Sequence, residues 1–112
     1  MSTYNVEPAE DFIYVTLGDT IDLSYSVSLN SVAYDMTGMK LDMVIRNKKK
    51  VAVKTLSSAG TSPAITISTT TFNISTTAFA AGGTYDFDIQ LTDGTDVMTI
   101  MNGQMIVQKQ IT

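Results

Sequence analysis

Gly83-Thr84-Tyr85-Asp86-Phe87-Asp88-Ile89-Gln90-Leu91 is the stretch of sequence that decides the fold. Its apolar and polar residues alternate, and alternate residues of a β-strand point to opposite faces of a sheet. Such a strand places one row of side chains on a hydrophobic core and the other row in solvent. Four side chains are therefore predicted to face the core: Tyr85, Phe87, Ile89 and Leu91.

Two turn signals follow this strand. Asp93-Gly94 favours tight turns with positive φ, so Thr95 to Met101 is predicted to return as the second arm of a hairpin. After Asn102-Gly103 a third strand is predicted from Gln104 to Ile111. Three strands of this kind bury one apolar face and need a second layer, which the earlier part of the chain must supply.

The composition is that of one domain without the usual metal ligands. The chain has 112 residues, enough for one modest core. It contains no cysteine and no histidine, which excludes disulfides and the usual ligands of zinc and copper, and no cofactor is expected. No apolar run approaches the roughly 20 residues of a membrane helix, and Met1 to Asn5 lacks the pattern of a signal peptide. We expect a soluble protein with no membrane partner.

Basic residues gather in one segment of the chain. The net charge of -4 argues against nucleic acid as a partner, because phosphate binding needs a basic surface. Six of the seven basic residues lie between positions 40 and 54, where Asp42 is the only acid, so this segment carries +5. Two interpretations stay open: a solvated hairpin tip, or a surface that meets an acidic neighbour such as a second copy of the chain.

The rest of the chain is also predicted to form short strands. Residues 1–10 are expected to form an extended arm and residues 11–112 a single domain. Residues 39–56 are predicted to form a hairpin tipped by lysines. Ser75 to Gly82 is predicted to form one short helical turn, with Phe79 under the sheet. Further strands are expected over Phe12 to Leu17, Thr20 to Ser28, Ala64 to Ser68 and Thr71 to Ile74. Seven to nine strands at a spacing of about ten residues are typical of a two-sheet sandwich.

No arrangement of residues indicates catalysis. Without histidine or cysteine the chain has no Ser-His-Asp or Cys-His site. Asp86 and Asp88 share one face of a strand, but their alternation with apolar residues favours a solvent face over paired catalytic carboxylates. These residues and Asp93-Gly94 lack the glycine spacing and terminal glutamate of a calcium loop. Four methionines stand where core-filling side chains are expected: Met39, Met43, Met101 and Met105.

Several short motifs follow one another in an informative order. Gly18-Asp19-Thr20 precedes a strand, Asp35-Met36-Thr37-Gly38-Met39 leads into Leu41 to Arg46, Gly82-Gly83-Thr84-Tyr85 opens the alternating strand, and Asn102-Gly103 precedes the last apolar run. This succession, over roughly residues 12 to 108, resembles the N-terminal domain of baseplate upper proteins of tailed bacteriophages and related Ig-like modules of phage virion proteins. The resemblance implies an all-β, Ig-like antiparallel β-sandwich of seven to nine strands with one short helical turn.

The same resemblance implies a role. In that family a long receptor-binding region follows the module, and this sequence does not contain it, so attachment to other virion proteins is the expected task. The implied function is a non-enzymatic virion structural protein, assembled in the host bacterial cytoplasm, with capsid decoration preferred over a tail or baseplate adaptor. Partners would be other phage virion proteins or further copies in the particle. The expected partner-binding residues are Tyr4 and Val6 in the arm and Lys48, Lys49 and Lys50 at the hairpin tip.

A carbohydrate-binding module is the competing function from a different class. Its distinguishing feature is an exposed aromatic platform. Tyr4, Tyr14 and Tyr34 are the only aromatic residues expected to be free of the core, and they lie on separate segments. The sequence therefore favours the structural role over sugar binding.

Overall fold

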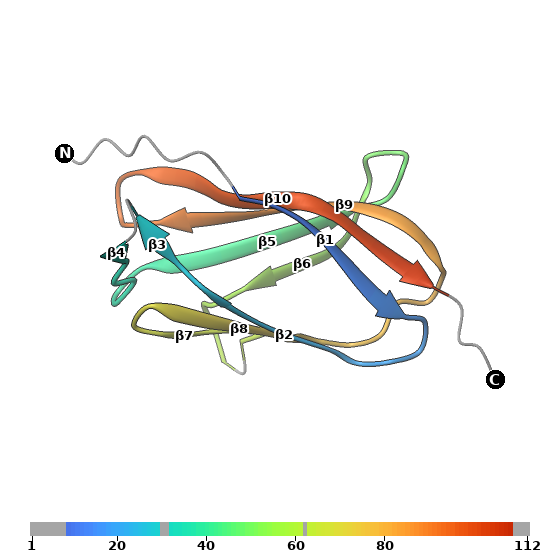
Figure 1. Cartoon of the computed structure of the whole chain (residues 1–112), viewed down its shortest axis with the longest axis horizontal. Helices are drawn as coiled ribbons and strands as arrows, with labels where there is room; N and C mark the ends of the chain where they lie inside the picture. Colours follow the sequence, from blue (N-terminus) through green and yellow to red (C-terminus); the bar gives the residue numbers. More distant parts are fainter. Residues whose placement is uncertain (1–8, 30–31, 62, 109–112) are drawn as a thin grey trace.

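Strand β9 (Gly83–Thr92) lies at the centre of the larger of two sheets, as its alternation predicts. The structure is a computed structural model, and it describes residues 9–29, 32–61 and 63–108. These residues form ten β-strands, most of them arranged in two facing layers, and contain no helix (Figure 1). The predicted all-β sandwich is confirmed.

The larger sheet has five strands in the order β1-β10-β9-β5-β6 and the smaller sheet has three in the order β2-β8-β7. The larger sheet also contains β1 (Ala9–Thr16), β10 (Val97–Gln108), β5 (Lys40–Arg46) and β6 (Ala52–Ser57). The smaller sheet consists of β2 (Ile21–Ser26), β8 (Thr71–Thr76) and β7 (Ile65–Ser68). A short antiparallel pair joins β3 (Ser28–Leu29) to β4 (Val32–Ala33).

This strand order is that of an immunoglobulin-like sandwich. In that fold strands B, E and D share one sheet, and strands C, F and G belong to the other. Here β2, β8 and β7 correspond to strands B, E and D, and β5, β9 and β10 correspond to strands C, F and G. The Tyr85 hydroxyl donates a hydrogen bond of 2.7 Å to the carbonyl oxygen of Ala81, just before β9. A tyrosine bonded in this way marks the corner before strand F in such domains.

Strand β1 is an edge of the larger sheet and the exception to antiparallel pairing. It runs parallel to β10, with Phe12 opposite Gln104 and Tyr14 opposite Ile106. Parallel neighbours are joined by long connections, so no local turn signal predicts such a pair. The strand begins at Ala9, three residues before the predicted start, and therefore includes the last two residues of the expected arm.

The inward face of β9 is buried as predicted. Phe87 is 3% exposed, and Tyr85 is 9% exposed. The Tyr85 ring stacks on Phe79, with 4.6 Å between the ring centres. Ile89 and Leu91 complete this buried row. Because burying one large apolar side chain contributes about 1.5–3 kcal/mol, this one face supplies a large part of the stabilising energy of the fold.

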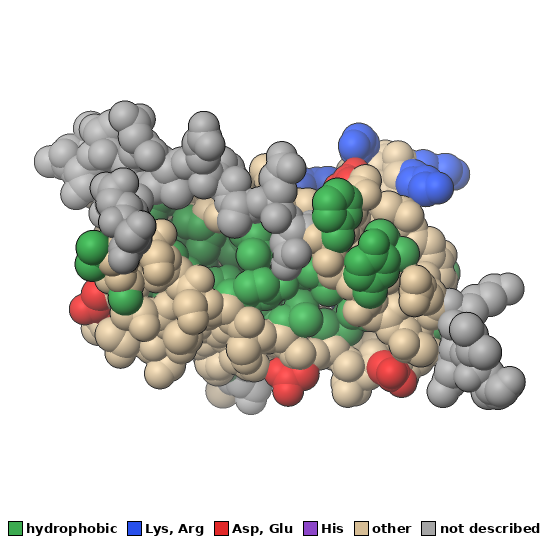
Figure 2. All heavy atoms as spheres, in the orientation of Figure 1, with side chains coloured by type: hydrophobic (Ala, Val, Ile, Leu, Met, Phe, Trp, Pro, Cys, Tyr) green, Lys and Arg blue, Asp and Glu red, His purple; other side chains and the backbone are tan. Residues whose placement is uncertain are grey.

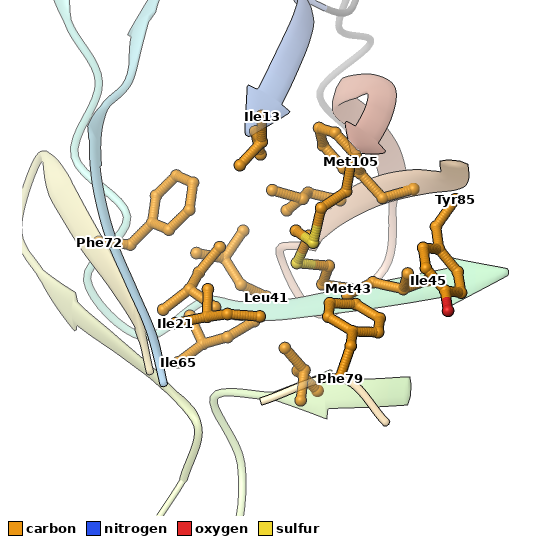
Figure 3. Packing of buried hydrophobic residues seen from close by; sticks show 14 of the residues in the cluster. Ile13, Ile21, Leu41, Met43, Ile45, Ile65, Phe72, Phe79, Tyr85 and Met105 are labelled. Carbon is orange, nitrogen blue, oxygen red and sulfur yellow. The ribbon is translucent and has the colours of Figure 1, made fainter. Parts of the chain in front are cut away.

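The two sheets meet across a single hydrophobic core. Figure 3 shows Ile21, Ile65 and Phe72 of the smaller sheet pointing toward the larger sheet, from which Met43 and Met105 point back. The predicted role of the methionines as core fillers is confirmed, since Met43 and Met105 are buried and Met39 and Met101 pack against the core from its margin.

The hairpin predicted at Asp93-Gly94 is confirmed, with its tip one residue further on. The Asp93 amide donates to the carbonyl oxygen of Asp96 at 3.1 Å, so Gly94 and Thr95 are the two tip residues. Gly94 has a φ of +109°, a conformation that a β-carbon makes costly. The Asp93 carboxylate accepts a hydrogen bond of 2.8 Å from the Asp96 amide, which fixes the loop from inside.

The third strand predicted after Asn102-Gly103 is wrong as a separate element. Asn102 and Gly103 lie inside β10, opposite Asp88 and Phe87 of β9, and β1 pairs with them on the other side. Hydrogen bonding to strands on both sides outweighs the turn preference of this dipeptide. The part of the predicted strand beyond Gln108 falls outside the described residues.

The short helical turn predicted from Ser75 to Gly82 is also wrong. Ser75 and Thr76 pair with β2, so the residues expected to cap a helix extend β8 instead. The threonine-rich run that precedes them favours extended backbone, because β-branched side chains pack well on a sheet. Phe79 is nevertheless buried beneath the sheet, as expected.

Candidate functional site

The predicted lysine tip is a closed turn between β5 and β6. The Asn47 amide donates to the Val51 carbonyl oxygen at 2.9 Å, and the Lys50 amide donates to the Asn47 carbonyl oxygen at 2.9 Å. The side-chain oxygen of Asn47 accepts two more hydrogen bonds, at 2.9 Å from the Lys49 amide and at 3.1 Å from the Val51 amide. Lys50 has a φ of +66°, uncommon outside glycine. The turn therefore presents Lys48, Lys49 and Lys50 on a preformed backbone, all three exposed.

The basic segment does not form one patch. Lys40, at the opposite end of β5, lies 3.5 Å from Asp42. The Lys54 ammonium donates to the Thr77 hydroxyl at 3.0 Å and lies 5.3 Å from the centre of the Phe79 ring. Arg46 and Lys50 pair with aspartates of β9. Within the described residues, the lysines of this segment without an ion pair or side-chain hydrogen bond are Lys48 and Lys49.

Two ion pairs lie on the outer face of the larger sheet, and one of them, from Lys50, connects the lysine tip to this face. The Lys50 ammonium lies 3.2 Å from Asp86, and the Arg46 guanidinium lies 3.5 Å from Asp88. The prediction that Asp86 and Asp88 occupy the solvent side of β9 is confirmed. Partly exposed pairs of this kind contribute about 0–1 kcal/mol to stability. Their main effect here is to neutralise the charge of the face.

An open depression of ≈ 740 Å³ lies on this outer face. Phe12, Gln104, Asp86 and Arg46 come from four adjacent strands and stand in one row across the sheet. With neighbouring strands about 4.8 Å apart, the row is roughly 14 Å long. All four residues line the depression, together with Lys50, Phe87, Asp88, Thr99, Asn102 and Gly103. An irregularity in the pairing of β10 with β9, between Thr99 and Met101, borders it, and such bulges are frequent beside functional sites.

Two aromatic rings stand on the same outer face of β1. Phe12 is 59% exposed and Tyr14 is 64% exposed, while Ile13 between them faces the core and is buried. The sequence predicts an exposed Tyr14 but not an exposed Phe12. In the structure Ile13 and Val15 pack on the core side of the strand and leave the aromatic residues outside, but all four residues are apolar, so the sequence carries no signal that separates the two faces.

The remaining predicted site residues have mixed outcomes. Tyr34 is half-buried and packs against the core, so its expected exposure is wrong. Tyr4 and Val6 lie outside the described residues. The exposure predicted for Lys48, Lys49 and Lys50 is confirmed. Among the predicted site residues that the structure describes, only Lys50 reaches the depression.

The described residues contain neither a metal-binding cluster nor a helix that could span a membrane. No group of three or more carboxylates within residues 9–29, 32–61 and 63–108 is placed to hold a metal ion. In the same part of the chain, no helix has the length and apolar character needed to cross a membrane. Asp86 and Asp88, the carboxylate pair weighed for catalysis, are each engaged with a cation.

Comparison with protein families finds no match, and no curated protein is significantly similar to the chain in sequence.

Proposed function

We propose that the chain is a non-enzymatic structural protein of a bacteriophage particle, a capsid auxiliary protein that attaches to a neighbouring virion protein. The resemblance in the order of its motifs motivates this proposal, and the immunoglobulin-like sandwich is the fold that the resemblance implies. A small sandwich of this kind carries its binding surfaces on its loops and sheet faces, because its interior is filled by its own core.

The observation that carries the proposal is the preformed lysine tip. Four hydrogen bonds, two of them to the side chain of Asn47, fix the backbone that presents the lysines. A turn that is already ordered loses little conformational entropy on binding, which favours association. Lys48 and Lys49 have no counter-charge in the described part of the chain, so the tip complements an acidic surface.

Protein analysis of purified particles tests the proposal directly. Particles are purified on a density gradient from lysates of the source culture, and the copy number of the chain is measured by quantitative mass spectrometry. A capsid auxiliary protein is expected at a copy number comparable to that of the major capsid protein. A few copies per particle would instead support the tail or baseplate adaptor. Absence of the chain from the particles would contradict both roles.

Charge reversal at the tip tests the attachment surface. In Lys48→Glu/Lys49→Glu, incorporation into particles is expected to fall about tenfold at low salt and less at high salt, because rim charges act mainly on association rate. Lys40→Glu is the matched control, since this lysine lies at the other end of β5, and it should be incorporated normally. Equal incorporation of both variants would move the attachment surface away from the tip.

The arm remains a second predicted contact, through Tyr4 and Val6. Deletion of residues 2–8 stops short of β1, so the domain should fold as before. If the arm docks on a neighbour, the truncated chain will not enter particles. Normal incorporation of the truncated chain would restrict attachment to the folded domain.

A further inference from the structure

The exposed aromatic rings of β1 offer apolar contacts, whereas the lysine tip offers positive charge. Phe12 borders the depression, and Tyr14 stands two residues further along the same face of the strand. Alternate residues of a strand are about 6.6 Å apart, so the two rings form one continuous apolar strip. Figure 2 shows hydrophobic side chains gathered over β1, close to the basic end of the molecule. Exposed aromatic rings beside polar groups are typical of binding surfaces.

The floor of the depression next to Phe12 is polar. Asn102 and Gln104 each carry a side-chain amide, which both donates and accepts hydrogen bonds. In the described part of the chain, neither amide side chain has a hydrogen-bond partner. Thr99 adds a hydroxyl group at the same edge. The depression thus offers donors and acceptors side by side, within reach of an aromatic ring.

The charges of the depression cancel. Arg46 and Lys50 are each paired with an aspartate, at 3.5 and 3.2 Å. An anionic ligand that bound these cations would leave Asp86 and Asp88 without partners, and a cationic ligand would do the same to Arg46 and Lys50. A neutral ligand with hydroxyl groups can donate to the aspartates and accept from the cations while both pairs persist.

We propose that this outer face binds a neutral carbohydrate chain, stacked on Phe12 and Tyr14 and hydrogen-bonded to the polar side chains of the depression. A sugar ring has one face of C–H groups, which packs on an aromatic ring, and an edge of hydroxyl groups, which matches the floor. The volume of ≈ 740 Å³ lies in the range of small-molecule sites, and the open shape accommodates a chain that continues beyond it. This inference goes beyond the structural role proposed above and does not depend on it.

Titration of the purified, ¹⁵N-labelled chain followed by NMR tests the site, because NMR detects weak binding. The probes are neutral hexamers of glucose in α and β linkage, of mannose and of N-acetylglucosamine, with the acidic hexamer of galacturonate for comparison. At least one neutral hexamer is expected to shift the amide signals of β1, β9 and β10 around Phe12, Gln104 and Asp86. Galacturonate should bind more weakly than that hexamer.

Three variants locate the binding face. Phe12→Ala should weaken binding about tenfold, and Gln104→Ala should weaken it several-fold. Val97→Ala is the matched control, because Val97 is an apolar residue 60% exposed at the other end of β10, and it should bind as the wild type does. The amide spectrum of each variant shows whether it is folded.

Three results would overturn the proposal: no response to any neutral hexamer, binding that Phe12→Ala leaves unchanged, or preferential binding of galacturonate. If no hexamer binds but Phe12→Ala lowers incorporation into particles, the face is a docking surface for protein instead. Because the titration uses the isolated chain, its failure is distinct from absence of the chain from particles.

Discussion

Two strands of this molecule carry aromatic residues at the same spacing and use them in opposite ways. On β9, Tyr85 and Phe87 face the core, whereas on β1 Phe12 and Tyr14 face solvent. The residues between them explain the difference. Asp86 separates the two rings of β9 and Asp88 follows them, and burying an unpaired carboxylate is costly, so the rings take the inner side. On β1 the intervening Ile13 takes the inner side instead. Aromatic alternation predicts a strand, and the interleaved residues decide which face is buried.

Truncation of one aromatic side chain on each strand should give the largest difference in the free energy of unfolding. Phe87→Ala leaves a cavity in the core and is expected to lower the free energy of unfolding by about 3–5 kcal/mol. Phe12→Ala removes an exposed ring and should change it by less than about 0.5 kcal/mol. Urea unfolding of both variants measures the contrast. Equal losses would show that β1 stabilises the fold through its outer face as much as β9 does through its inner face.

The turn that places β10 against β9 gives the next largest effect. Gly94→Val should cost about 1–3 kcal/mol, because Gly94 has a φ of +109°. No atom lies within 4 Å of the position that a β-carbon would occupy there, so the cost is backbone strain rather than a clash. Thr95→Val, at the neighbouring tip position, is the matched control for placing a valine side chain in this loop. Thermal unfolding unchanged by Gly94→Val would count against this account of the turn.

Removal of one hydroxyl distinguishes the tyrosines of the two strands. Tyr85→Phe deletes the hydrogen bond to the Ala81 carbonyl oxygen and should lower stability by about 0.5–1.5 kcal/mol. Tyr14→Phe deletes an exposed hydroxyl and should leave the midpoint of urea unfolding unchanged. If the two variants behave alike, the hydrogen bond of Tyr85 does not stabilise the corner before β9.

The smallest effect is expected from an exposed loop outside both strands. The Asp35 carboxylate accepts hydrogen bonds from the Thr37 hydroxyl at 2.5 Å and the Thr37 amide at 2.9 Å, which hold the pKa of Asp35 below its ordinary value of 3.8. The folded state therefore favours the charged form. This small contribution is present at neutral pH and is lost as the pH falls through the lowered pKa. Asp35→Asn should differ from wild type at pH 7, and the difference should shrink as the pH is lowered below 3.8; a constant difference in urea midpoint would contradict this.

Strands in which apolar and polar residues alternate clearly, and which a short turn motif joins, could be predicted from the sequence. The hairpin of β9 and β10 and the lysine-tipped hairpin of β5 and β6 are both of this kind, and their inner faces are confirmed. The parallel pairing of β1 with β10 could not be predicted, because nothing near either strand encodes it. The turn expected at Asn102-Gly103 fails for the same reason, since strands on both sides hold that dipeptide extended.

The candidate site was predicted less completely than the fold. The lysine tip follows from local charge and turn residues, so the sequence shows it directly. The depression is built around one row from four strands, and the pairing of Phe12 with Gln104 and of Gln104 with Asp86 exists only once the sheet has formed. The segment Phe12-Ile13-Tyr14-Val15 is apolar on both sides, and its alternation therefore gives no preference for either face.

The central claim is that the fold does not require the aromatic side chains on the outer face of β1, which we propose to be a recognition surface. The free energy of unfolding of Phe12→Ser/Tyr14→Ser, measured by urea denaturation, tests this claim most directly. A value within about 0.5 kcal/mol of wild type is predicted, because both side chains are more than half exposed. A loss of about 3 kcal/mol or more, on the scale of a truncated core side chain, would show that the two rings belong to the packing of the sandwich.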